Sequence, residues 1–130
     1  MEKPDHIKYW ILQSLDDWEA VNTLFLGKKN LQALFFAHLV IEKLCKAIWI
    51  RDNISNFPPR THNLNYLLSQ TSIILSDPDG ELLLSLNRFH LEGRYPEYIS
   101  QIHRLCSVSF TSDLIDKTNE IRLWLTNQLQ

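Results

Sequence analysis

The sequence predicts an all-α protein, an up-and-down helical bundle of about five helices. Apolar residues recur with helical spacing along almost the whole chain, and strand-like alternation is nearly absent. Residues 33–50 (ALFFAHLVIEKLCKAIWI) form a nearly unbroken apolar stretch, which indicates a helix that is buried on most of its sides. Glycine and proline interrupt the pattern at intervals that permit short connections between neighbouring helices.

The first two helices have clear ends in the sequence. The first is predicted to stop at Gly27, and its apolar residues lie close to helical spacing: Trp10, Leu15, Trp18, Val21, Leu24 and Phe25. Asn30 can cap the second helix, which continues to about Arg51 or Asp52. A loop follows at residues 53–59 (NISNFPP), because paired prolines remove donors and restrict the residue before them.

The remaining helices are shorter. Thr61 or Asn63 can cap a third helix, whose apolar face is predicted to hold Leu64, Leu67, Leu68, Ile74 and Leu75. Asp77 and Pro78 supply a cap and a first-turn proline for a fourth helix, which Gly93 and Pro96 end. Residues 97–110 leave open a further turn of helix around Ile99 to Leu105. Thr111 or Ser112 is expected to cap the last helix, with an apolar stripe of Leu114, Ile115, Thr118, Ile121, Leu125 and Leu129.

Length and composition indicate one globular domain over residues 1–130. Hydrophobic residues make up 45% of the chain and charged residues 22%. No apolar run approaches the roughly 20 residues that span a bilayer, and the first residues (MEKPDHIKYW) lack the apolar run of a signal peptide. We therefore expect a soluble, cytoplasmic protein that does not contact a membrane.

Several kinds of site have no support in the sequence. Cys45 and Cys106 fit neither a CxxC nor a Cys/His spacing, which argues against a disulfide framework and a zinc site. The three glycines form no phosphate-binding loop, so P-loop and Rossmann nucleotide sites are excluded. We expect no bound metal and no cofactor.

The net charge of −2 argues against a generic nucleic-acid binder, but the charge is unevenly spread. Residues 28–76 hold six bases against two acids, a local balance of +4. This region can attract phosphate. Alternatively, Lys28, Lys29 and Arg51 only solvate helix ends.

The apolar second helix carries a stripe of ionisable residues. His38, Glu42 and Lys46 follow one another at four-residue spacing and therefore lie on one side of the helix. In a functional interpretation Glu42 orients His38 in a cleft, and Lys46 or Lys43 meets a nucleotide phosphate. In a structural interpretation Glu42 pairs with Lys46 or with Arg94, because buried charges are usually paired.

Two further segments combine candidate phosphate ligands. The residues at the start of the third helix, where free N–H groups favour anions, are Arg60, Thr61, His62 and Asn63. A Thr or Asn cap with an exposed His is the commoner arrangement there. Arg94 and Tyr95 can form a phosphate clamp with a stacking ring. Alternatively, Arg94 pairs with Glu42 and Tyr95 packs against its neighbours.

Three segments together resemble a known family. The helix FFAHLVIEKLCKA, the loop PPRTHNLNYLL and the tripeptide Arg94-Tyr95-Pro96 are similar to the HEPN domain (higher eukaryotes and prokaryotes nucleotide-binding). The resemblance covers about the whole chain. It implies a five-helix bundle that commonly dimerises and is often encoded beside a minimal nucleotidyltransferase, as a toxin–antitoxin pair.

Many members of the superfamily that the chain resembles are metal-independent ribonucleases. They use an Arg followed by a His after four to six intervening residues: His shuttles a proton from the ribose 2′-hydroxyl while Arg stabilises the phosphorane-like transition state. Arg94 resembles the Arg of this motif, but the matching positions hold Ile99, Ser100 and Gln101. His103 lies too far along, unless residues 97–102 are irregular. Arg60 and His62 are separated by one residue, as are Arg88 and His90.

Three functions remain open at this point. The first is a homodimeric binding or interaction module that partners a minimal nucleotidyltransferase and binds a nucleotide or RNA; the apolar second helix could face the second copy. The second is a ribonuclease toxin that uses Arg94 with a displaced His103. The third is a nucleotide-binding module in which Arg60, His62, Lys43 and Arg94 contact phosphates.

Overall fold

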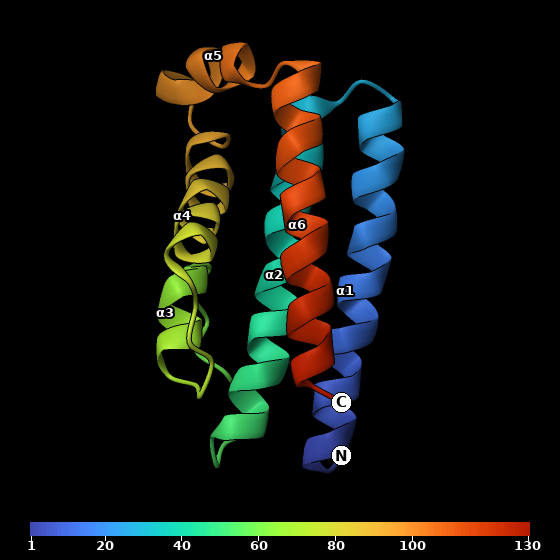
Figure 1. Cartoon of the computed structure of the whole chain (residues 1–130), viewed down its shortest axis with the longest axis vertical. Helices are drawn as coiled ribbons and strands as arrows, with labels where there is room; N and C mark the ends of the chain where they lie inside the picture. The colour runs from blue at the N-terminus through green and yellow to red at the C-terminus, as the bar shows by residue number, and fades with distance from the viewer.

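A computed structural model describes all residues of the chain, 1–130, and contains helices but no strands (Figure 1). Six helices follow one another: α1 Lys3–Leu26, α2 Asn30–Asp52, α3 Leu64–Ser69, α4 Asp77–Glu92, α5 Pro96–Leu105 and α6 Val108–Gln128. Four of them, α1, α2, α4 and α6, alternate in direction along the long axis (Figure 1). The predicted all-α, up-and-down helical bundle is confirmed, with six helices instead of about five.

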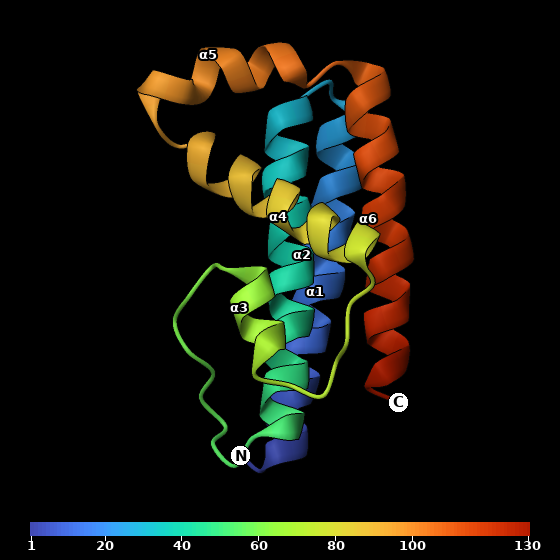
Figure 2. The same ribbon diagram turned by 60° about the vertical axis from the view of Figure 1, so that its left-hand side comes forward.

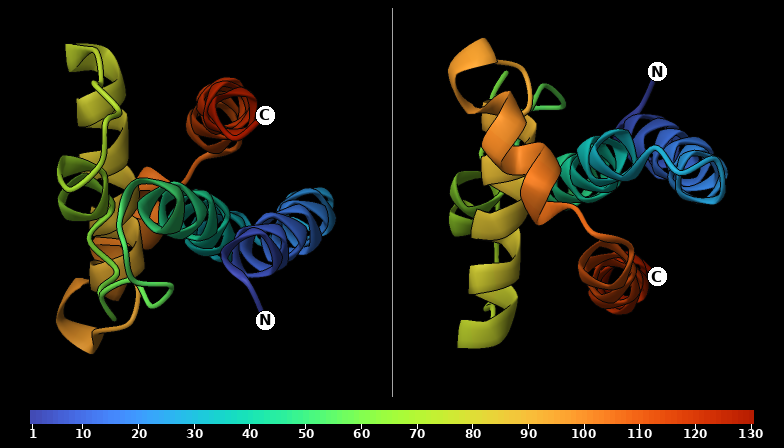
Figure 3. Two further views of the ribbon diagram at one scale, coloured as in Figure 1. Left: turned by 90° about the horizontal axis from the view of Figure 1, so that it is seen from below. Right: turned by 90° about the horizontal axis from the view of Figure 1, so that it is seen from above.

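The bundle is built around α2. Seen along the long axis, α2 lies between α1, α6 and the α3–α4 pair, which surround it on different sides (Figure 3). α5 crosses the end of the bundle where α4 stops and α6 begins (Figure 2). Because α2 has neighbours on three sides, its large apolar side chains are fully buried: Leu34, Ile41, Leu44, Ile48 and Ile50. The apolar stretch in the sequence therefore forms the centre of the core.

The predicted ends of the first two helices are close to the observed ones. α1 ends at Leu26, and the turn places Lys28 in the left-handed region with a φ of 63°. α2 ends at Asp52 as predicted, but Asn30 does not cap it. Asn30 is the first helical residue, and its Nδ2 instead donates to the carbonyl of Cys106, 2.9 Å away. A contact between distant segments has replaced a local cap.

Two predicted caps and one helical face are wrong. Asn63 caps α3 through its side chain, but this helix ends at Ser69, so Ile74 lies outside it and is 88% exposed. The serine directly before α4, Ser76, caps that helix in place of Asp77. Ser107 caps α6, which therefore begins four residues before the position expected from Thr111. A serine hydroxyl three residues before a free N–H supplies the same bond in both cases.

The segment that the sequence left open forms a regular helix, α5. Tyr95 occupies its cap position, Pro96 its first helical position and Ile102 is its one buried side chain. No helix of the chain is both long and apolar enough to cross a membrane.

We predict that Ile41→Ala lowers the free energy of unfolding by about 2–5 kcal/mol, because it opens a cavity in a fully packed core. Ile41 is completely buried on α2, whereas Leu26 at the end of α1 is 82% exposed. The control Leu26→Ala should change the stability by less than about 0.5 kcal/mol. Urea unfolding followed by circular dichroism measures both; equal losses would contradict a core centred on α2.

Candidate functional site

A polar cluster lies where α2, the loop before α3, and α4 meet. Its first member is His38, which is fully buried on α2. The Nε2 atom of His38 lies 2.7 Å from the carbonyl oxygen of His62 and 3.2 Å from Oδ1 of Asn87. Because both oxygens only accept, Nε2 must carry the hydrogen, and Nδ1 is left as a lone pair. Nδ1 has no hydrogen-bond partner, and burial lowers the pKa of His38.

Asn87 fixes this arrangement from the side of α4. Its Nδ2 donates to Oδ1 of Asn65 at 3.0 Å and to Oδ1 of Asn63 at 3.3 Å. Its Oδ1 accepts from the backbone N–H of Leu64 at 3.1 Å as well as from His38. One half-buried amide therefore joins the start of α3 to both α2 and α4.

Glu42 orients His62 and not His38. Its Oε1 lies 2.6 Å from Nδ1 of His62 but 3.9 Å from Nδ1 of His38. Its Oε2 accepts from Nζ of Lys46 at 3.2 Å, and that ammonium lies 5.1 Å from the centre of the Trp10 ring. The prediction that Glu42 orients His38 is therefore wrong, because the loop carries a second imidazole closer to the carboxylate. The expected Glu42–Lys46 pair is present.

His90 on α4 completes a stack of aromatic rings. Its ring lies between Phe35, 4.6 Å away, and His38, 4.1 Å away, and is tilted towards His62 at 4.7 Å. His90 is only 4% exposed and makes no side-chain hydrogen bond within the chain. Burial lowers the pKa of His90 to about 3, helped by the nearby charges of His38, Arg94 and His62. The buried pair His38 and His90 is therefore neutral at pH 7.

These residues border a cleft of about 310 Å³. Its lining residues come from the loop before α3, from the second half of α4 and from the turn after α4: Thr61, His62, Asn63, Asn87, His90, Leu91 and Arg94. In Figure 2 this loop rises from the lower end of α2 and meets α3 below α4. Arg94 donates from Nε to the carbonyl of His90 at 3.1 Å, which directs the guanidinium while leaving its terminal nitrogens available. A guanidinium, two imidazoles and two amides around one hollow are groups that bind a phosphate.

The structure brings only some of the predicted site residues together. His62 and Arg94 share the cleft, and Lys46 reaches it indirectly through Glu42. Lys43 pairs with Asp17 of α1 instead. Arg60 is exposed outside the cleft, and Tyr95 is half-exposed at the start of α5.

Two predicted pairings of Arg94 are absent. Glu42 pairs with His62 and Lys46, so the expected ion pair between Glu42 and Arg94 does not form. His103 could meet Arg94 only if residues 97–102 were irregular, and these residues are helical in α5. His103 is exposed on α5 and does not line the cleft. The geometry gives no support to the ribonuclease pair of Arg94 and His103.

Asn87 and His90 are site residues that the sequence analysis missed. His90 follows Leu83 and Leu86 at helical spacing and lies on the buried side of α4. A histidine on an otherwise apolar stripe is a signal that could have been used. Asn87 carries no such signal, because its partners come from segments more than twenty residues away.

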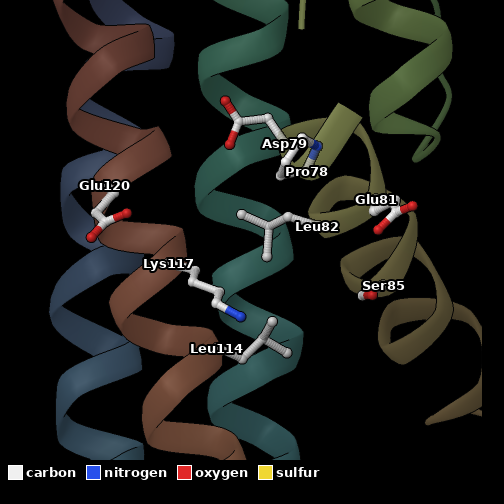
Figure 4. Close-up of a pocket in the computed structure, with 8 residues that line it drawn as sticks. All are labelled: Pro78, Asp79, Glu81, Leu82, Ser85, Leu114, Lys117 and Glu120. Carbon is white, nitrogen blue, oxygen red and sulfur yellow. The ribbon is translucent and has the colours of Figure 1, made fainter. Parts of the chain in front are cut away.

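A second hollow, of about 380 Å³, lies between α4 and α6 (Figure 4). Leu82 and Leu114 face each other across it, and Asp79, Glu81 and Glu120 make its rim acidic. Lys117 is its single base and already pairs with Asp113. This hollow is therefore unsuited to an anion. Nowhere do three or more His, Cys, Asp or Glu side chains gather as metal ligands.

Comparison with known proteins agrees with the resemblance seen in the sequence. The family model of the HEPN domain matches residues 7–128, nearly the whole chain. No curated protein and no solved structure matches the chain.

We predict that His90 makes the fold sensitive to mild acid. The ordinary pKa of a histidine is 6.5, whereas the pKa of His90 in the folded protein is about 3. As the pH falls, the unfolded chain therefore binds a proton at this residue before the folded protein does. The contribution of His90 to the free energy of unfolding is therefore fully present above pH 6.5 and is lost as the pH falls below it. Between pH 7 and pH 5 the free energy of unfolding should fall by about 2 kcal/mol because of His90. His90→Phe keeps an aromatic ring beside Phe35 and removes this contribution. Urea unfolding at both pH values tests it; an unchanged pH dependence in the variant would contradict the assignment.

Proposed function

Because this chain belongs to the HEPN domain family, we propose that it is a binding module that holds a phosphate group of a nucleotide or of RNA. The observation that carries the proposal is that His62, His90 and Arg94 converge on one cleft. Family membership supports a nucleotide-related or RNA-related role for the same chain.

The donors of the cleft are held in place before a ligand arrives. The Nε bond of Arg94 to the His90 carbonyl leaves a fork of terminal N–H groups, which suits two phosphate oxygens at once. Oδ1 of Asn63 is occupied by Tyr66 and Asn87, so the Nδ2 of Asn63 remains a donor at the cleft wall. Such prior ordering reduces the entropy cost of binding.

The cleft favours phosphate over nucleobase. Leu91 is its one apolar lining residue, and both faces of the His90 ring are already covered by Phe35 and His38. A base therefore finds no free face on the His90 ring on which to stack. Tyr95 and Tyr98, each 45% exposed, follow Arg94 in the chain and are the nearest aromatic residues in sequence that a base could meet.

We propose that the protein works as a homodimer. Tyr9, Leu12 and Leu15 are about half exposed on α1, on the side turned away from its buried residues. Phe35 and Leu39 are half-buried on α2. Clustered apolar side chains on a surface favour a protein partner, and a second copy is the simplest.

We also propose that a minimal nucleotidyltransferase is a partner of the module in the cytoplasm, within a toxin–antitoxin pair. This part rests on the family resemblance, and the reading frame next to the gene is the most direct check. A nucleotidyltransferase encoded there that co-purifies with the protein would support the pairing. An isolated gene whose product purifies alone would count against it.

Arg94→Ala is predicted to weaken binding of ATP and of a short RNA by about 10- to 100-fold, because it removes a charged donor worth roughly 1.5–3 kcal/mol. Arg104→Ala is the matched control, since Arg104 is exposed on α5 outside the cleft. Titration calorimetry at 0.1 M salt measures both variants. Equal weakening in the two variants would mean that the phosphate binds elsewhere.

The dimer is tested by light scattering at several concentrations. We expect twice the mass of one chain for the wild type. The double variant Leu12→Glu and Leu15→Glu should have the mass of one chain, because two carboxylates cannot be buried unpaired in an apolar interface. A wild-type mass of one chain at all concentrations would refute the dimer.

A further inference from the structure

We propose that the cleft takes a terminal phosphate together with one proton, which His62 holds between Glu42 and the ligand. The proposal rests on the phosphate site described above and adds the class of ligand and the pH dependence of binding. It depends on one feature of the structure: two imidazoles, His62 and His90, line the cleft, and only that of His62 is exposed and bonded to a carboxylate.

His62 is placed to carry a proton between two anions. Its Nδ1 lies 2.6 Å from Oε1 of Glu42, and a carboxylate oxygen accepts, so the neutral ring keeps its hydrogen on Nδ1. Nε2 then has only a lone pair, which repels a phosphate oxygen. The side chain of His62 is 55% exposed and lines the cleft. A second proton on Nε2 converts it into a donor, while the bond to Glu42 is kept and becomes an ion pair.

The other two imidazoles cannot take this role. His38 is fully buried and already uses Nε2 for the His62 carbonyl and Asn87, so it has no path to a ligand. His90 is stacked on His38 at 4.1 Å, where two charged rings would repel each other. Burial lowers the pKa of both. Both rings remain neutral, and His90, which lines the cleft, can still offer one N–H.

The charges around His62 determine which phosphate fits. On α2 the carboxylate of Glu42 faces it, and Lys46 at 3.2 Å balances that carboxylate. Arg94, two residues after the end of α4, lines the same cleft, and the loop carries the exposed Arg60. With neutral His62, Arg94 is the one uncompensated charge within the cleft.

A phosphodiester carries one negative charge, which Arg94 alone can balance. A terminal phosphate carries about 1.5 to 2 negative charges at pH 7. Protonation of His62 gives the cleft a second positive charge beside the first. With His62 protonated, the positive charge of the cleft therefore balances the charge of a terminal phosphate. With His62 neutral, it balances the charge of a phosphodiester.

The test compares two ligands with the same base and sugar, AMP and 3′,5′-cyclic AMP. Calorimetric titration at pH 7 in two buffers of different ionisation enthalpy counts the protons taken up. We expect an uptake of about 0.5 to 1 proton with AMP, because the free phosphate already carries part of that proton, and close to none with cyclic AMP, with about tenfold tighter binding of AMP. The affinity for AMP should fall as the pH rises, because binding of AMP takes up a proton.

His62→Gln is the informative variant, because an amide can still donate to Glu42 but cannot take up the proton. We expect it to lose the proton uptake and the preference for AMP over cyclic AMP. His103→Gln makes the same substitution on α5, outside the cleft, and should behave as wild type. If His62→Gln does not fold, a wild type that binds AMP without taking up a proton still refutes the proton-coupled site.

The outcomes separate the two proposals. If both ligands bind and neither takes up a proton, the proton-coupled site is refuted and the phosphate cleft stands. If proton uptake persists in His62→Gln, the proton is held elsewhere and the assignment to His62 is wrong. If neither ligand binds, the phosphate cleft itself is refuted, and the proton-coupled site with it.

Discussion

The carboxylate of Glu42 is the group on which the arrangement of the site depends. It lies in the middle of the most apolar helix and is 4% exposed, so it must be paired to remain charged at an acceptable free energy. Lys46 supplies one partner from the same helix, but only His62 comes from another segment. The bond to His62 therefore holds the loop before α3 against α2, and the carbonyl of His62 in turn fixes the hydrogen of His38.

The same bond explains why a cleft exists at this place. The loop is held on one side by Glu42 and on the other by Asn87, which binds the first residues of α3 from α4. Between these two attachments the chain cannot close over His90, whose ring stays at the base of the hollow. Arg94 emerges one turn later at the end of α4. A structural ion pair and a candidate ligand site are thus parts of one network, which removes the choice between them that the sequence seemed to require.

Much of the fold could be predicted because local signals decide it. The apolar period gives the long helices, Gly27 and the paired prolines give their ends, and Asn63 caps α3. The wrong predictions of helix caps have two causes: a contact with a segment far away in the chain, or an earlier residue that can cap the same helix. Asn30 donates to a carbonyl seventy-six residues away instead of capping α2, and Ser107 caps α6 ahead of the equally suitable Thr111. In the site, helical spacing correctly gave the pair of Glu42 and Lys46, but spacing cannot show that a loop imidazole lies closer to Glu42 than His38 does.

Glu42 and Asn87 hold the three histidines in defined states, and the nitrogen chemical shifts of the imidazole rings measure these states directly. In a two-dimensional ¹⁵N spectrum of the ligand-free protein at pH 7.5, the account predicts that His38 is neutral with its hydrogen on Nε2. It predicts that His62 carries its hydrogen on Nδ1, and that His90 is neutral and stays so when the pH is lowered to 5.5. A His38 ring with its hydrogen on Nδ1, or a His62 ring with its hydrogen on Nε2 alone, would contradict it.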